Sequence, residues 1–251
     1  MSVLVFLDLD DTIMQTLPKC PPGERLEIAA VNRDGSPGSF MTKKQRALVD
    51  WLLATTHVIP CTGRNLSAYQ RVKLPFTGQA ILNHGGTIAD ARGEPDLGWY
   101  DRVDPALVPL GALQDAVLGH ARENGLTLRA RLIGDHDRTL YLSVKHPAAD
   151  MAQIALCAAF LEKTIDHATQ RLVSSANNLA VIPRAFSKGR AVRHLIASRG
   201  FPDEVVLGFG DTPSDLGFMA ACDLSVLPQR SPLSHAMHAA VRVGAGLGDD
   251  E

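Results

Sequence analysis

The 251-residue sequence lacks the features that mark membrane and nucleic-acid-binding proteins. No apolar run approaches the roughly 18 residues that a membrane-spanning helix needs, and the N-terminal residues resemble a strand rather than a charged and then apolar leader. Basic and acidic residues nearly balance, 25 against 27, and they form no basic block. We therefore expect neither a nucleic-acid partner nor a membrane partner.

Cysteine is also scarce, with four copies that lie far apart: Cys20, Cys61, Cys157 and Cys222. They form no paired spacing for a metal, and the nine histidines include no H-E-x-x-H pattern, so we expect no zinc site. We interpret the cysteines as reduced thiols and expect a cytoplasmic location. The 45% hydrophobic and 21% charged content is typical of a globular enzyme.

What the sequence does contain is an apolar strand that ends in carboxylates. Residues 3–7 form a continuous run rich in branched side chains, which is typical of a parallel strand covered on both faces. Asp8, Asp10 and Thr12 follow, at the position where reactive groups gather in open α/β sheets. The spacing places Asp8 and Asp10 on one side of the extended chain, close enough to share a cation.

The order of predicted elements divides the chain into two domains. Near both ends, strands alternate with helices, as in a doubly wound, Rossmann-like parallel sheet. One of these helices is predicted to run from its N-cap Thr42 to about Ala54. These strands are predicted at residues 3–7, 57–61, 80–82, 205–209 and 224–226. In between, the order becomes helix, two strands, helix, two strands, starting with a helix at 105–124. We therefore predict an α/β core, residues 1–92 and 184–251, with an inserted α+β (αββαββ) cap, residues 93–183.

Two segments leave alternatives open. Residues 26–31 and 39–41 are predicted to pair as a hairpin, which is either a mobile flap or a surface excursion without a function. Several polar residues of the insert either read a bound substrate or form a solvated face. They are Arg129, Arg131, Lys145, His146, Asn177 and Asn178.

Polar residues also follow the later strands. Thr62 follows 57–61, Asp211 and Asp215 follow 205–209, and Lys188 lies near the start of a predicted helix. Carboxylates at several strand ends are hard oxygen ligands that suit Mg²⁺. A lysine and hydroxyls beside that cation form a pocket for a phosphate, which a carboxylate can attack.

In this order, the motifs resemble those of the haloacid dehalogenase superfamily phosphatases. The motifs are Asp8-x-Asp10-x-Thr12, Thr62-Gly63-Arg64, Lys188-Gly189 and Gly210-Asp211-x-x-Ser214-Asp215. The insert resembles the larger cap of the branch with Cof-type, sucrose-phosphate, trehalose-phosphate and mannosyl-3-phosphoglycerate phosphatases. The resemblance implies a Mg²⁺-dependent phosphomonoester hydrolase that works through an aspartyl-phosphate. Its expected substrate is a small phosphorylated metabolite, foremost a sugar phosphate, and its expected state is a monomer or a homodimer.

The resemblance also assigns roles to single residues. Asp8 would be the nucleophile and a Mg²⁺ ligand, and Asp10 the general acid and base, with its backbone carbonyl as a ligand. Asp211 would be the third protein ligand, and Asp215 either a ligand or an outer-shell carboxylate. Lys188 would be catalytic, holding phosphoryl oxygens and reducing their repulsion by Asp8. The other phosphate-binding or substrate-binding candidates are Thr12, Thr62, Gly63, Arg64, His84 and Ser214.

The sequence departs from the family's pattern in two places. Ser214 stands where the family usually has asparagine, and His84-Gly85-Gly86 stands where Cof-type members commonly have Asn-Gly-Ala. A His-Gly at this point is similar to trehalose-phosphate phosphatases. Alternative functions are a phosphomutase or phosphotransferase of the same superfamily, and a phosphoacceptor signalling domain. The Asp-x-Asp spacing and the inserted cap, which we expect to close over the core and select the leaving group, argue against a signalling domain.

Overall fold

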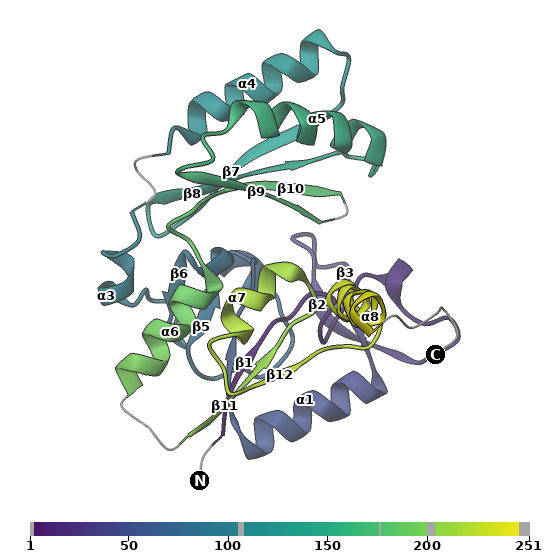
Figure 1. The fold of residues 1–251 in the computed structure, drawn as a ribbon, viewed down its shortest axis with the longest axis vertical. Helices are drawn as coiled ribbons and strands as arrows, with labels where there is room; N and C mark the ends of the chain where they lie inside the picture. Colours follow the sequence, from purple (N-terminus) through teal and green to yellow (C-terminus); the bar gives the residue numbers. More distant parts are fainter. Residues whose placement is uncertain (1–2, 105–107, 176, 200–203, 246–251) are drawn as a thin grey trace. The chain divides into compact units, whose positions relative to one another are not determined.

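The computed structural model describes residues 3–104, 108–175, 177–199 and 204–245. The chain divides into two compact units, Met1–Asp96 with Lys188–Glu251, and Leu97–Ser187 (Figure 1). The sequence placed the insert at residues 93–183, and the catalytic and cap roles of the two parts stay predictions.

The first unit contains a parallel sheet with β1 (Val3–Leu7) in an inner position. The order of its strands is β12 (Leu224–Val226), β11 (Val205–Phe209), β1 and β4 (His57–Pro60). Leu4 to Leu7 are all buried, because β1 has a strand on each side and side chains packed on both faces. The predicted parallel core is confirmed.

Helices and loops cover this sheet. α1 (Lys43–Thr55) begins with a capping box between Thr42 and Gln45, and its Val49 and Leu52 pack in one core cluster with Val5. The prediction that Thr42 is the N-cap of this helix is confirmed. The remaining α-helices of the unit are α2 (Leu66–Tyr69), α6 (Lys188–Arg199), α7 (Leu216–Met219) and α8 (Pro232–Ala245).

Two hairpins complete the first unit. β2 (Leu26–Val31) pairs with β3 (Pro37–Thr42), and Ala29 and Met41 are buried in the core cluster. The hairpin therefore packs against the core with part of each strand. β5 (Ala80–Leu82), predicted as a parallel strand, pairs antiparallel with β6 (Thr87–Ala89) and meets the end of β4 through a parallel bridge between Cys61 and Ile81. Three short 3-10 helices are η1 (Leu17–Lys19), η2 (Asn83–Gly85) and η3 (Pro213–Asp215).

The second unit is an antiparallel sheet with helices α4 (Leu110–Glu123) and α5 (Met151–Thr164) on one face (Figure 1). Its strands run in the order β7 (Arg129–Asp135), β8 (Arg138–Lys145), β10 (Asn178–Pro183) and β9 (Gln170–Ser175). Side chains alternate across a strand, and Ala130 and Val144 pack with the helices. Arg129, Arg131 and Lys145 therefore lie on the opposite face of this sheet.

The start of this unit corrects one predicted boundary. The sequence predicted a helix from residue 105, but α4 begins at Leu110, and residues 105–107 lie outside the part that the structure describes. Pro109 is the N-cap, and a proline disfavours helical backbone in the residue before it. A short helix that the sequence did not predict, α3 (Leu97–Tyr100), precedes α4. Among the described residues, no helix is long and apolar enough to span a membrane.

Candidate active site

The carboxylate of Asp8 lies at the end of β1, between a lysine and a threonine. The backbone N–H of Asp8 donates to the carbonyl of Phe209, 2.9 Å away, which fixes the residue at this edge of the sheet. Its Oδ1 accepts a hydrogen bond from Lys188 Nζ at 2.6 Å, and its Oδ2 accepts from the Thr12 hydroxyl at 3.0 Å. Asp8 is only 5% exposed, so these contacts are shielded from bulk water.

Lys188, the first residue of α6, bridges two carboxylates. Its Nζ lies 2.6 Å from Oδ1 of Asp8 and 2.7 Å from Oδ1 of Asp215. The close packing of α6 against α7 places it there. A Cβ atom at Gly189 would lie 2.2 Å from the carbonyl oxygen of Gly217, so this approach requires a glycine. The Lys-Gly motif therefore provides both the cation and the room for its helix.

The segment after β11 supplies two further buried carboxylates. Oδ1 of Asp211 lies 3.3 Å from the Thr12 hydroxyl, whose single proton can serve either Asp8 or Asp211. Oδ2 of Asp215 accepts from the backbone N–H of Thr212 at 3.1 Å and from its hydroxyl at 2.9 Å. Thr212 was not among the predicted site residues, although Thr212-x-x-Asp215 has the spacing of a capping box.

These three carboxylates form a cluster that fits a divalent metal ion. Oxygen atoms of Asp8, Asp211 and Asp215 all lie within 4.8 Å of one another. Carboxylate oxygens are hard ligands, which suit Mg²⁺ better than zinc or copper. The two oxygens of Asp215 accept from Lys188 and Thr212, and its two alternative roles, as a ligand and as an outer-shell carboxylate, stay predictions.

The pKa values show that this site lacks positive charge. Burial raises the pKa of Asp8 and Asp211 from 3.8 to about 7, and nearby carboxylates add to both shifts, although Lys188 opposes them. Burial would also raise the pKa of Asp215, but Lys188 and Thr212 hold it below its ordinary value. Burial would lower the pKa of Lys188, but Asp8 and Asp215 raise it above its ordinary value. One ammonium thus faces three carboxylates, and a bound cation would supply the missing charge.

Asp10 does not join this cluster but forms an ion pair with Arg64. Nε of Arg64 lies 2.7 Å from Oδ2 of Asp10, and Nη2 lies 2.7 Å from Oδ1. The sequence predicted that Asp8 and Asp10 share one cation, but the side chain of Asp10 turns to the guanidinium instead. Its backbone carbonyl as a metal ligand stays a prediction. Asp11, the next residue, has a positive φ of 64° and pairs with Lys19.

Thr62, Gly63 and His84, which were predicted as site residues, lie together where β4 ends beside β5. Thr62 is 1% exposed, and its hydroxyl accepts from the backbone N–H of Arg64 at 3.2 Å. The His84 ring covers Gly63 so closely that a Cβ there would lie 2.3 Å from His84 Cε1. His84 has a left-handed backbone with φ 58°, which is uncommon for residues other than glycine, although histidine is among the types that adopt it more often. The predicted phosphate-binding roles of these residues stay predictions.

Two other predicted groups make mainly local contacts. The Ser214 hydroxyl lies 2.8 Å from that of Thr212, beside the acidic cluster. In the second unit, Nδ1 of His146 accepts from the backbone of Ala148 and Asp150, and Asn177 bonds to the backbone of His146. His146 and Asn177 thus stabilise a loop.

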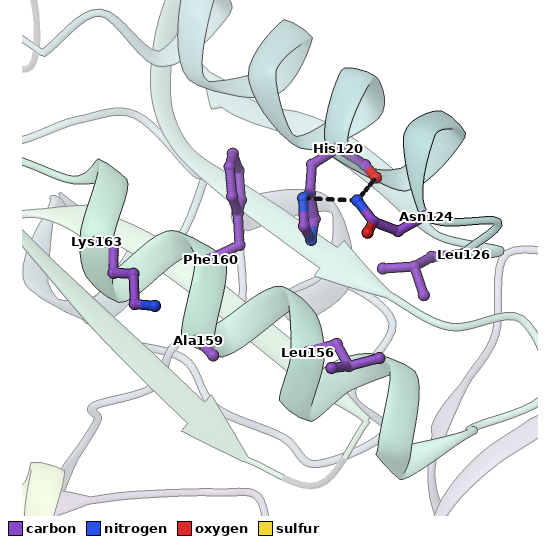
Figure 2. Close-up of a pocket in the computed structure, with 7 residues that line it drawn as sticks. All are labelled: His120, Asn124, Leu126, Leu156, Ala159, Phe160 and Lys163. Carbon is purple, nitrogen blue, oxygen red and sulfur yellow. Dashed lines mark hydrogen bonds between the residues drawn. The ribbon is translucent and has the colours of Figure 1, made fainter.

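The second unit also has a shallow hollow of about 260 Å³ between α4 and α5 (Figure 2). The rings of His120 and Phe160 stack in it, with centroids 4.1 Å apart and planes at 5°. Asn124 donates to Nδ1 of His120 at 3.1 Å if that nitrogen carries no proton. Leu126, Leu156 and Ala159 complete mostly apolar walls, with Lys163 beside them. No carboxylate lines this hollow, so it does not fit a metal-dependent reaction.

A known protein family matches part of the chain. The family model of the haloacid dehalogenase-like hydrolases matches residues 137–230, which include Lys188, Asp211 and Asp215. The resemblance to this family is confirmed. None of the curated proteins matches the chain significantly in sequence.

Solved structures with the same fold extend the similarity to most of the chain. A haloacid dehalogenase-like hydrolase from Bacteroides thetaiotaomicron has a TM-score of 0.55 at 14% identity, over 96% of this chain and 100% of that one. Sucrose-phosphatase from Synechocystis, in complex with sucrose and phosphate, has a TM-score of 0.54 at 15% identity, over 97% and 99%. The C-terminal domain of C. albicans trehalose-6-phosphate phosphatase has 0.56 at 15%, over 100% and 79%.

At these identities the similarity establishes the fold. The predicted α/β class with a parallel-sheet core is confirmed. The hydrolase family model supports the prediction that the chain is an enzyme.

Proposed function

We propose that the protein is a Mg²⁺-dependent phosphomonoester hydrolase with Asp8 as its nucleophile. The observation that carries this proposal is the carboxylate of Asp8, which Lys188 and Thr12 hold beside Asp211. A fixed, buried carboxylate beside an ammonium and a metal-binding cluster suits in-line attack on a phosphate.

The proposed reaction has two steps. In the first, an oxygen of Asp8 attacks phosphorus, the bond to the leaving oxygen breaks, and Asp10 gives its proton to that oxygen. In the second, water attacks the aspartyl-phosphate, Asp10 takes the proton from the water, and the bond between phosphorus and Asp8 breaks. Inorganic phosphate and an alcohol are the products, so atoms and protons balance.

The surrounding residues support both steps. Lys188 lowers the repulsion between Asp8 and the phosphate, and Thr62 is proposed to hold a phosphoryl oxygen. The residues that would hold Mg²⁺ are Asp8, Asp211 and the carbonyl of Asp10, with Asp215 in the outer shell. The ion would neutralise charge on the phosphoryl oxygens.

A small phosphorylated metabolite is the proposed substrate, and a sugar phosphate is the first class to test. Its support is the similarity to sucrose-phosphatase and to a trehalose-6-phosphate phosphatase domain, both of which act on phosphorylated sugars by name. The second unit is proposed to select the leaving group.

The experiment is a screen of phosphorylated metabolites that measures released phosphate with Mg²⁺ and with EDTA. Asp8→Asn should abolish the activity, because an amide cannot attack phosphorus. Asp11→Asn is the matched control, since Asp11 lies in the same motif but pairs with the exposed Lys19. A folded Asp8→Asn protein with substantial turnover would refute the assignment.

The same preparation distinguishes the alternatives. A phosphomutase or phosphotransferase would move the phosphate to another hydroxyl and release little of it. A signalling domain would give a stable phosphoprotein after treatment with acetyl phosphate, whereas the proposed hydrolase turns the aspartyl-phosphate over.

A further inference from the structure

The ion pair between Arg64 and Asp10 indicates a role for Arg64 in the proposed reaction. We propose that Arg64 is a positioning residue, which holds the carboxylate of Asp10 in place for proton transfer, and that it does not bind the phosphate. This inference rests on the proposed function, because it concerns the group that protonates the leaving oxygen.

The ion pair is bidentate. Nε and Nη2 of Arg64 each lie 2.7 Å from a different oxygen of Asp10. Two parallel hydrogen bonds from a planar guanidinium fix the direction of a carboxylate as well as its distance. A lysine at position 64 could donate to the same carboxylate, but it would not fix the plane of the group.

Arg64 is itself anchored, which an orienting residue requires. Its Nη2 also donates to the Ser39 hydroxyl at 3.1 Å, and its Nη1 lies 3.4 Å from the carbonyl oxygen of Ala68. Ser39 belongs to β3 and is 4% exposed. The β2–β3 hairpin thus forms part of the support of Arg64.

The backbone of Arg64 is fixed in the same way. Its N–H donates to the Thr62 hydroxyl at 3.2 Å, and its carbonyl accepts from the N–H of Asn83 at 2.9 Å. Backbone and guanidinium are therefore both held by other parts of the first unit.

The side chains of Arg64 and Asp10 differ in their exposure to solvent. The side chain of Arg64 is 18% exposed, whereas that of Asp10 is 49% exposed. The guanidinium is therefore the buried support, and the carboxylate is the half-exposed group that a substrate can reach. All three guanidinium nitrogens already lie near protein oxygens, so a phosphate would have to compete with Asp10 for them.

Without Arg64, the half-exposed side chain of Asp10 would sample several rotamers. Only the steps that use its proton would suffer. An alkyl phosphate needs that proton, because an alkoxide is a poor leaving group, whereas p-nitrophenolate leaves without one. The second step uses Asp10 with either substrate, so the selective effect on alkyl phosphates is expected in the first step, the release of the leaving group. A single-turnover measurement isolates this step.

The test measures kcat and KM of Arg64→Gln and Arg64→Lys for p-nitrophenyl phosphate and for the best alkyl phosphate of the screen. With the alkyl phosphate, we expect kcat of Arg64→Gln to fall on the order of 10²-fold, as for a misplaced catalytic group. KM should stay within a fewfold, the single-turnover release of p-nitrophenolate should slow far less than that of the alcohol, and Arg64→Lys should recover part of the loss.

Coupling to Asp10 provides the decisive comparison. If Arg64 acts through Asp10, Asp10→Asn with Arg64→Gln should be no slower on the alkyl phosphate than Asp10→Asn alone. Arg46→Gln is the control, because Arg46 also pairs with an aspartate, Asp50, through its Nε, on α1 and outside the site. Ser39→Ala is a milder second variant, expected to shift the same ratio of activities in the same direction.

Three results would overturn the proposal. Equal losses on both substrates with a raised KM would make Arg64 a phosphate ligand. Additive losses in the double variant would show that it does not act through Asp10. If Arg64→Gln does not fold, an unchanged ratio in Ser39→Ala and Arg64→Lys has the same force. An inactive wild type would instead contradict the proposed function, and with it this inference.

Discussion

Nζ of Lys188 lies 2.6 Å from Oδ1 of Asp8, although 180 residues separate the two in the sequence. The same ammonium contacts Asp215 at 2.7 Å, and all three residues are buried. The lysine therefore balances the negative charge of two buried carboxylates. This makes it important for stability as well as for the proposed reaction.

Replacing Lys188 by methionine should destabilise the metal-free protein strongly. Removing one partner of a buried ion pair typically costs about 3–5 kcal/mol, because the remaining charge has no compensation. The measurement is the free energy of unfolding in urea with EDTA. Lys19→Met, which removes an exposed pair with Asp11, should cost less than about 1 kcal/mol. Equal effects of the two variants would contradict the role given to Lys188.

Mg²⁺ should raise the Tm more at about pH 8 than at about pH 5. In the folded protein without metal, the pKa of Asp8 and Asp211 is about 7 instead of 3.8, so the fold favours their protonated forms. The two carboxyl groups therefore contribute fully to the free energy of unfolding below pH 3.8, and this contribution is lost as the pH rises through about 7. Mg²⁺ binds the ionised carboxylates and offsets this loss.

Calorimetry with and without Mg²⁺ at both pH values measures this difference. Asp211→Asn should reduce the gain in Tm at the higher pH, whereas Asp223→Asn, outside the cluster, should leave it unchanged. A gain that is independent of pH would show that these carboxylates do not bind the ion.

Gly189→Ala should destabilise the protein and lower its activity. The new Cβ would lie 2.2 Å from the carbonyl oxygen of Gly217, so α6 would have to move and would carry Lys188 with it. Overpacking of this kind costs about 1–3 kcal/mol. Gly111→Ala on α4 is the matched control, since nothing lies within 4 Å of its Cβ, and it should be neutral or stabilising. The measurements are the free energy of unfolding and the rate of phosphate release of both variants. Equal values for the two variants would contradict the prediction.

Arg129→Ala and Arg131→Ala should alter substrate selection if the second unit selects the leaving group. Both side chains are exposed on the face of its sheet opposite α4 and α5. We expect kcat/KM for the best metabolite to fall in at least one variant, with little change for p-nitrophenyl phosphate. Arg122→Ala, on α4, is the control. Small, equal effects on both substrates in both arginine variants would argue against this role.

Some of the local structure could be predicted because short patterns determine it. The apolar run 3–7 predicted a buried strand, and Thr42 predicted the start of α1, as the structure shows. Short elements were harder. The predicted strand β5 meets the end of β4 through a parallel bridge, but its antiparallel pairing with β6 was not predicted, because β-pairing depends on which segments meet. The predicted start of α4 was wrong because Pro109 disfavours helical backbone in the residue before it. This signal is local and could have been recognised in the sequence.

The sequence by itself determined which residues are available for the chemistry and which strand ends they follow, since motif spacing and hydrophobic pattern are local properties. The tertiary structure alone decided the partners. In the folded protein, Asp10 pairs with Arg64 instead of joining the acidic cluster, and Thr212 donates a hydrogen bond to Asp215. The His84 ring packs against Gly63. Such contacts depend on how closely separate loops approach at the sheet edge. Differences of about an ångström there decide which oxygen a donor reaches, and neither composition nor spacing encodes them.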